Sequence, residues 1–326
     1  MNKHSMAAKI LGIFLVLAAA ASCTLFQPAR RDPLSSVARH TPEAVARGEY
    51  LFRHVGDCAG CHAMVNPRTH ALDRALPVAG GALYTKDSGV PGKIYVPNIT
   101  PAPQTGLGGW SDGEIVRALR EGVSRDGRAL FPMMPHASCF RVLSDDDALA
   151  IVAYIRTLAP VEHVVPAREL DFPVNLIVNT IPEPLTGPVP PPAATPLEKG
   201  RYLVRIAGCA ECHTPRDDRG QPLPNMSMAG GHHLRLLDLA PGEAAILMPN
   251  LTPDGETGLG RWTDDQSRVA MTEGARPDGT RLAPQGPAAI FHDLAPEDVS
   301  ARITYLRTVT PVRNPKAVRV AARAAP

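Results

Sequence analysis

Apolar residues recur at helical spacing near the middle of the chain, directly after a polar residue that can cap a helix. Ser144, a favoured N-cap residue, precedes residues 145–158. Within that range the apolar positions are Ala148, Ile151, Val152, Ile155 and Leu158. Because steps of three and four residues place side chains on one side of a helix, we predict an amphipathic helix with its apolar face in a core.

The same signals predict further helices in both halves of the chain. Thr41 is followed by a proline suited to the first turn and by an acidic residue suited to the positive end of a helix. Capping boxes of the form S/T-x-x-E/Q begin at Ser111 and Thr263, and a last helix begins near Pro296. The pattern predicts an all-α fold, with about three helices in each half and long loops rich in glycine and proline.

The two halves repeat each other in register. PNITP at 97–101 matches PNLTP at 249–253, an offset of 152 residues, and other motifs match at 151 or 152. We therefore predict a duplicated domain, with one copy at residues 41–160 and the other at 197–313. Residues 161–196 are predicted to form a proline-rich linker between them.

Each copy carries the same short cysteine motif, CAGCH at 58–62 and CAECH at 209–213. Two cysteines two residues apart, with a histidine immediately after, are the attachment signature of c-type haem. The predicted thioether residues are Cys58, Cys61, Cys209 and Cys212. The predicted proximal iron ligands are His62 and His213. A zinc site made from the four cysteines is the alternative, and it leaves both histidines unexplained.

Composition agrees with bound haem and excludes some partners. Only 5% of the 326 residues are aromatic, which is little for two independent cores unless a large flat apolar group fills each one. The net charge of +2, without a basic block, argues against nucleic acid as a partner.

The first residues have the form of an export signal. Residues 1–22 combine lysines with a short apolar segment, and small residues then precede Cys23. We expect Cys23 to be lipidated after cleavage, so that residues 23–40 tether the protein to a membrane. An ordinary signal peptide with an incidental cysteine is the alternative. Either version predicts export to the periplasm.

Segments outside the two copies have their own expected roles. In the linker, PVPPP at 188–192 should be extended and fairly stiff, and the apolar residues 172–181 should pack along a domain surface as a strap. Residues 314–326 lack a core pattern and are expected to form a flexible tail. Cys139 is expected to be a buried thiol.

These motifs together resemble those of a known family. Both halves resemble class I c-type cytochrome domains, and residues 41–313 as a whole are similar to bacterial periplasmic dihaem cytochromes c. Beyond CxxCH, the resemblance rests on PN(I/L)TP, TGLG.W and the closing YxRTxxPV. It implies two covalently bound c-type haems. It also implies a methionine as sixth iron ligand, from a loop before the last helix.

The first copy has that loop and the second departs from it. LFPMMP at 130–135 offers Met134 as the ligand, with Met133 as the alternative. In the second copy Gly286 takes the aligned position, so the sixth site there is either open or water-bound, or is filled by His292. Further candidates for that site are Gln285, Met226, Met228, His232, His233 and Met248.

The resemblance implies an electron-transfer protein that passes electrons between a periplasmic donor, such as a dehydrogenase, and an acceptor, such as an oxidase. Such a chain is a carrier, or the cytochrome subunit of an oxidoreductase, and we assign it no catalytic residue. The alternative is a dihaem oxidoreductase, peroxidase-like or thiosulfate-oxidising, with its active site at the second haem. A haem-based sensor is a third possibility. Trp110 and Trp262 are expected at the haem edges, with simple core packing as the alternative. Asn98 and Asn250 are expected to fix turns.

Overall fold

The structure is a computed structural model that describes residues 26–218, 220–234, 245–284 and 286–317. The predicted export signal, Cys23, Gln285 and residues 318–326 lie outside the described residues. Within the described part of the chain, no helix combines the length and the apolar character needed to span a membrane.

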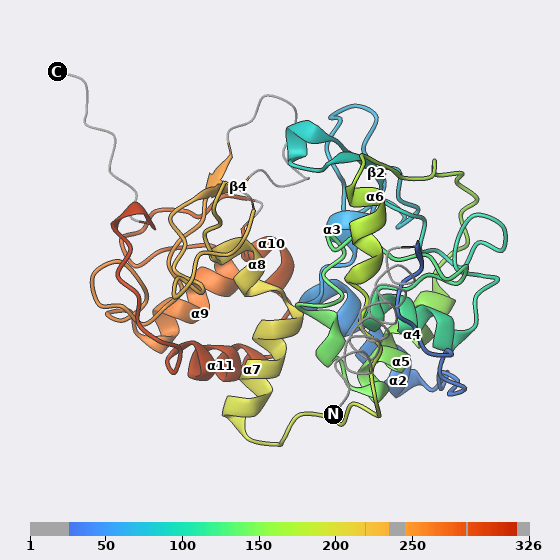
Figure 1. The fold of residues 1–326 in the computed structure, drawn as a ribbon. Helices are drawn as coiled ribbons and strands as arrows, with labels where there is room; N and C mark the ends of the chain where they lie inside the picture. Colours follow the sequence, from blue (N-terminus) through green and yellow to red (C-terminus); the bar gives the residue numbers. More distant parts are fainter. Residues whose placement is uncertain (1–25, 219, 235–244, 285, 318–326) are drawn as a thin grey trace, which may run out of the picture.

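The first half is built from helices around one core, with a small sheet at its edge (Figure 1). Its helices are α2 (Pro42–Tyr50), η1 (Leu51–Val55), α3 (Ala59–His62), η2 (Lys86–Ser88), α4 (Asp112–Glu121), η3 (Phe140–Val142) and α5 (Asp145–Thr157). The sheet has the antiparallel order β1 (Leu83–Tyr84), β2 (Gly92–Tyr95) and β3 (Glu169–Leu170).

The second half repeats this order of helices. Its helices are α7 (Pro196–Ile206), α8 (Cys209–His213), α9 (Asp264–Glu273), α10 (Ala288–Phe291), α11 (Pro296–Leu306) and η5 (Pro315–Ala317). A two-stranded antiparallel sheet joins β4 (His233–Leu234) to β5 (Ile246–Leu247). Between the halves lie α6 (Val174–Ile177) and η4 (Val178–Thr180).

The caps read from the sequence are present. The Ser144 hydroxyl accepts a hydrogen bond from the Asp147 amide at 3.1 Å, and so begins α5. Ser111 and Thr263 each form a reciprocal capping box with the residue three positions later. These bonds satisfy amides that the first turn of a helix leaves without partners, which explains why the helices begin at these residues.

The first and last helices of each half cross in close contact at a glycine. A Cβ atom built on Gly48 would stand 1.9 Å from the Ala150 carbonyl oxygen, and one on Gly200 would stand 1.9 Å from that of Ala301. No side chain larger than hydrogen fits at either crossing. The two glycines therefore set how α2 packs on α5 and how α7 packs on α11.

A π-helical turn explains why the offset between the halves changes from 152 to 151. In the first half α2 runs into η1, where the Gly56 amide donates to the Leu51 carbonyl, five residues earlier, at 2.8 Å. The second half has a regular helix at this place, α7, and one residue fewer. The wider turn accommodates the extra residue, so both motif helices keep the same relation to the helix before them.

The two halves meet through a reciprocal pair of hydrogen bonds. Tyr50 of the first half donates to the Asp298 carboxylate at 2.7 Å, and Tyr202 of the second half donates to the Asp147 carboxylate at 2.7 Å. Each aspartate lies in the first turn of the last helix of its half. Buried apolar residues on both sides form a single cluster, so the boundary is a shared core rather than a hinge.

The segments outside the halves match the expectations only in part. Val178 is 1% exposed, so the predicted strap does pack, but Phe172 in the same strap is 79% exposed. Val189, in the proline-rich segment, accepts a hydrogen bond from the Asp145 amide at the start of α5. The prediction of a loose tail is wrong for residues 314–317. Asn314 is buried there, because its side chain donates to the carbonyls of Ala229 and Gly230.

Candidate functional site

Each CxxCH motif forms a single short helix that follows a left-handed residue. In the first half that residue is Asp57, with φ of 44°, and in the second half it is Gly208, with φ of 65°. The reversal of the chain there ends the preceding helix and begins α3 or α8. Helical geometry places the two cysteines of each motif about one turn apart, which is the spacing that thioether attachment to one porphyrin edge requires.

The histidine of each motif is held by the same kind of bond. His62 Nδ1 lies 2.9 Å from the Pro97 carbonyl oxygen, and His213 Nδ1 lies 2.8 Å from that of Pro249. Since a carbonyl only accepts, Nδ1 carries the proton and the lone pair of the ring lies on Nε2. Each ring would thereby offer Nε2 to the iron of an attached haem, and the bond at Nδ1 is of the kind that metal-binding histidines commonly make.

Burial keeps both imidazoles in the neutral form that binds iron. Desolvation lowers the pKa of His62 below its usual value, and it lowers the pKa of His213 to about 4. Both rings are therefore neutral at pH 7. Donor type, tautomer and charge all fit a covalently attached haem. By contrast, no cluster of three or more His, Cys, Asp or Glu side chains suited to a metal ion occurs among the described residues.

The loops that supply the two proline carbonyls are fixed by buried asparagines. Asn98 donates to the Val161 carbonyl at 2.8 Å, and its own side-chain oxygen accepts from the amide and hydroxyl of Thr100. Asn250 makes the matching bonds in the second half, to Val312 at 2.7 Å. The sequence predicted a turn at these residues. The structure adds that this turn positions the proline carbonyl that accepts the hydrogen bond of the motif histidine. The asparagine side chain also joins the turn to the segment after the last helix of the same half.

The two motifs lie near each other across the boundary between the halves. Burial raises the pKa of the Cys212 thiol to about 11, and the nearby charges that add to this shift include the Cys61 thiol of the other motif. Cys139 also lies at this boundary and is 3% exposed, which confirms the prediction of a buried thiol. Its sulfur would lie 3.4 Å from a Cβ atom on Gly208.

The arginine of each YxRT motif holds the turn that contains the tryptophan of its half. Arg156 donates to the carbonyls of Leu107 and Trp110, and Arg307 does the same for Leu259 and Trp262. These bonds fix the TGLG.W turn against the last helix of each half. The sequence identified the motif but did not indicate this contact.

The predicted sixth-ligand loops differ in the structure as they do in sequence. Met134 is half-buried and packs against the main core of the first half. In the second half Gly286 precedes α10, and the His292 side chain lies 54% exposed just after that helix. Its Nδ1 lies 3.1 Å from the Ala288 carbonyl and its Nε2 lies 3.0 Å from the Asp293 carboxylate. Ligation through Nε2 would require the contact with Asp293 to break, whereas the Nδ1 contact with the Ala288 carbonyl is compatible with it.

Other candidates for the second sixth site lie beside the proximal histidine. The Met228 amide donates to the Thr214 hydroxyl, and the Gly230 amide donates to the His213 carbonyl. His232 is near enough to His213 that its protonated form would lower the pKa of the His213 ring further. A sixth ligand would have to come from the side of the haem away from His213, so positions next to His213 suit packing around it better than ligation.

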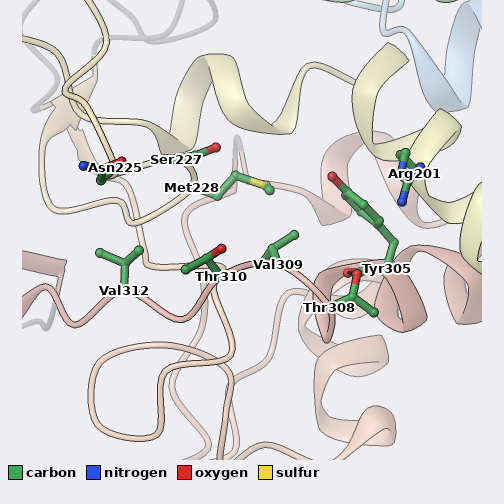
Figure 2. Close-up of a pocket in the computed structure, with 9 residues that line it drawn as sticks. All are labelled: Arg201, Asn225, Ser227, Met228, Tyr305, Thr308, Val309, Thr310 and Val312. Carbon is green, nitrogen blue, oxygen red and sulfur yellow. Dashed lines mark hydrogen bonds between the residues drawn. The ribbon is translucent and has the colours of Figure 1, made fainter.

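A separate hollow of about 570 Å³ lies in the second half, and Figure 2 shows Met228 at its centre. Its lining comes from α7, α11, the segment after α11 and the loop around Met228: Arg201, Asn225, Ser227, Met228, Tyr305, Thr308, Val309, Thr310 and Val312. None of these belongs to the CxxCH motif. Met228 nevertheless belongs to the apolar cluster against which Cys209 and Ala210 pack, so the hollow lies next to the second motif.

Comparison with known proteins gives the family. The cytochrome c family model matches residues 45–159. A diheme cytochrome c-type from Cereibacter sphaeroides is 34% identical over 291 residues, which cover 83% of this chain and 94% of that protein. The gluconate 2-dehydrogenase cytochrome c subunit of Pantoea cypripedii is 33% identical, with 81% of this chain and 59% of that protein covered.

The fructose dehydrogenase cytochrome subunit of Gluconobacter japonicus is 32% identical, with 87% of this chain and 55% of that protein covered. The chain thus spans little more than half the length of these two dehydrogenase subunits. It nevertheless aligns with almost the whole of the diheme protein, and its motif histidines have the tautomer and burial of haem ligands. The chain belongs to the bacterial c-type cytochromes, the proteins that bind haem c covalently.

Proposed function

We propose that the chain is a periplasmic electron-transfer protein with two tandem cytochrome c domains, each carrying one covalent haem. The observation that carries this proposal is the repetition of a complete attachment site in both halves. Each site has two thiols, one neutral histidine and a carbonyl that orients it. Haem c supplies a one-electron couple when it is bound, and the residues of this chain attach it, orient its proximal ligand and exclude water.

The shared core between the halves supports electron transfer within the chain. Cys61 and Cys212 belong to different motifs, and the Cys61 thiol is among the groups near enough to influence the pKa of the Cys212 thiol. The reciprocal tyrosine–aspartate bonds hold this arrangement without a hinge. A fixed short separation between two redox centres favours transfer within one molecule over transfer between molecules.

The partner is proposed to be a dehydrogenase that donates electrons, with an oxidase as an acceptor. Two of the similar proteins are named as cytochrome subunits of dehydrogenases, one for gluconate and one for fructose. We propose the same type of role here and do not assign a substrate. Export through residues 1–22 and a lipid anchor on Cys23 would place the protein at the periplasmic membrane surface, where such partners act.

Mass spectrometry of the mature protein tests the haem count. We expect the mass of the polypeptide and any lipid plus two haems, and a single haem would refute the tandem-site proposal.

A reduction assay tests the partner. The purified protein should be reduced by a periplasmic dehydrogenase in the presence of its substrate, at a rate that falls when ionic strength screens docking charges. Reduction by none of the dehydrogenases of the source cell would refute the proposed partner class.

A second function, catalysis at the second haem, is favoured by one observation only. Gly286 offers no ligand where Met134 stands in the first half. Carbon monoxide binding distinguishes the two cases. If the sixth site of the second haem is open, the parent protein should bind carbon monoxide at that haem alone. Met134→Ala should then allow the first haem to bind carbon monoxide as well. If neither haem of the parent binds carbon monoxide, both sites are filled and the catalytic alternative fails.

A further inference from the structure

Arg302 is a buried cation without a hydrogen-bond partner. It lies in the middle of α11 and is 1% exposed. Its three guanidinium nitrogens, Nε, Nη1 and Nη2, are all buried, and none has a hydrogen-bond partner in the structure. An unpaired ion in a protein interior costs several kcal/mol, so such an arrangement is rare unless the charge has a use.

The carboxylate that could neutralise Arg302 is already engaged elsewhere. Asp298 lies one turn earlier on α11, where it pairs with Lys199 and accepts from Tyr50 at 2.7 Å. Arg302 instead stacks on the Phe291 ring, with its guanidinium carbon 4.5 Å from the ring centroid. This contact supports the flat face of the guanidinium but does not cancel its charge.

The positive charge of Arg302 acts at the second haem-attachment site. Leu306, one turn after Arg302 on α11, belongs to the apolar cluster against which Cys209 and Ala210 of the motif pack. In agreement, the positive charge of Arg302 opposes the rise that burial causes in the pKa of the Cys209 thiol. The helix that carries Arg302, α11, packs on α7, and α7 leads directly into the motif helix α8. Arg302 therefore lies on the helix that packs next to the second attachment motif.

The first half has no such charge at the matching position. Ala150 and Tyr154 contact Gly48 as Ala301 and Tyr305 contact Gly200, so the two last helices are in register. The residue that matches Arg302 is Ile151, an apolar core residue that is 5% exposed. The two sites share one scaffold, and this position gives the second site a positive charge that the first lacks.

We propose that Arg302 is an electrostatic tuning residue that raises the reduction potential of the second haem. A nearby cation disfavours the ferric state, which carries one more positive charge than the ferrous state, and the low dielectric of the interior strengthens the effect. The charge thereby offsets the loss of the methionine ligand at Gly286, since thioether ligation would itself favour the ferrous state. This inference rests on the proposed function, because it requires haem at Cys209 and Cys212.

Potentiometric titration of the purified dihaem protein, followed by visible absorption, tests the proposal. The variant Cys209→Ala with Cys212→Ala retains only the first haem and so identifies its wave. Arg302→Met, which keeps similar volume without charge, should move the second wave to lower potential and leave the first unchanged. Arg302→Lys should retain most of the parent potential. Arg201→Gln removes a cation that is 54% exposed on α7, and should shift the second wave less than Arg302→Met.

Two outcomes with the Arg302 variants overturn the inference. One is a second wave that Arg302→Met does not move, and the other is an equal shift in the Met and Lys variants, which would indicate packing alone. Asp298→Asn gives an independent measurement if Arg302→Met fails to fold. It removes a negative charge one turn before Arg302 on α11 and leaves Arg302 in place, so the second wave should rise, and an unchanged or lower wave refutes the proposal. A parent protein with one wave and one haem instead refutes the proposed dihaem function.

Discussion

Removal of the two tyrosine hydroxyls at the boundary should weaken the union of the two halves. Tyr202 donates to the Asp147 carboxylate at 2.7 Å and accepts from the Ser144 amide at 3.2 Å. Burial raises the pKa of the Tyr202 phenol, so the group is a protonated donor at any physiological pH. Tyr50 makes the matching bonds from the first half to the second. It donates to the Asp298 carboxylate at 2.7 Å and accepts from the Ala295 amide at 3.3 Å.

The size of the effect follows from these bonds. A hydrogen bond to a charged group contributes about 1.5–3 kcal/mol, and a buried amide left without its acceptor adds to the loss. Phenylalanine keeps the ring and its packing, so the change isolates the hydroxyl. We expect Tyr202→Phe to lower the free energy of unfolding by about 2–3 kcal/mol. We expect about 1.5–2 kcal/mol for Tyr50→Phe, whose ring is less buried.

Calorimetry of the haem-loaded protein is the assay. The parent should unfold in one transition, because the halves share a core. The variant that combines Tyr202→Phe with Tyr50→Phe should unfold in two transitions. Tyr154→Phe is the matched control. Its hydroxyl accepts from Arg53 at 2.8 Å within the first half, so it should cost about 1 kcal/mol and preserve the single transition. The reasoning is refuted if Tyr202→Phe destabilises no more than Tyr154→Phe and the double variant still unfolds in one step.

Four further results are expected. Gly200→Ala should cost about 3 kcal/mol or more, seen as a lower midpoint in urea, because the added methyl meets the backbone oxygen of α11 at 1.9 Å; a parent-like midpoint would contradict the crossing. Asn250→Ala should cost about 3 kcal/mol, since it leaves buried partners unpaired, and parent-like stability would refute the role of that turn. Cys209→Ala with Cys212→Ala should lower the haem count by mass from two to one, and a loss of both haems would show that the halves do not load independently. Cys23→Ser should move the protein from the membrane fraction to the soluble fraction, and full retention in the membrane would exclude this anchor.

Local sequence was sufficient for the features whose causes are local. The caps at Ser144 and Ser111 act within one helical turn, so a short pattern reveals them. The CxxCH motifs are equally local, because their spacing alone satisfies the attachment chemistry. The offset repeat predicted that the two halves share a scaffold, and the contrast of Met134 with Gly286 predicted that the two candidate haem sites differ.

Tertiary structure alone decided the features that join distant residues. The acceptor of His62 is the carbonyl of Pro97, 35 positions later, and a backbone acceptor leaves no mark in the side-chain pattern. Tyr50 and Asp298 are 248 positions apart, so neither periodicity nor motif spacing pairs them. Arg302 falls on the buried face of an amphipathic helix, where the pattern predicts an apolar residue. Its burial and its missing partners became evident only after α7, α10 and α11 were packed together, because burial is a property of the assembled helices.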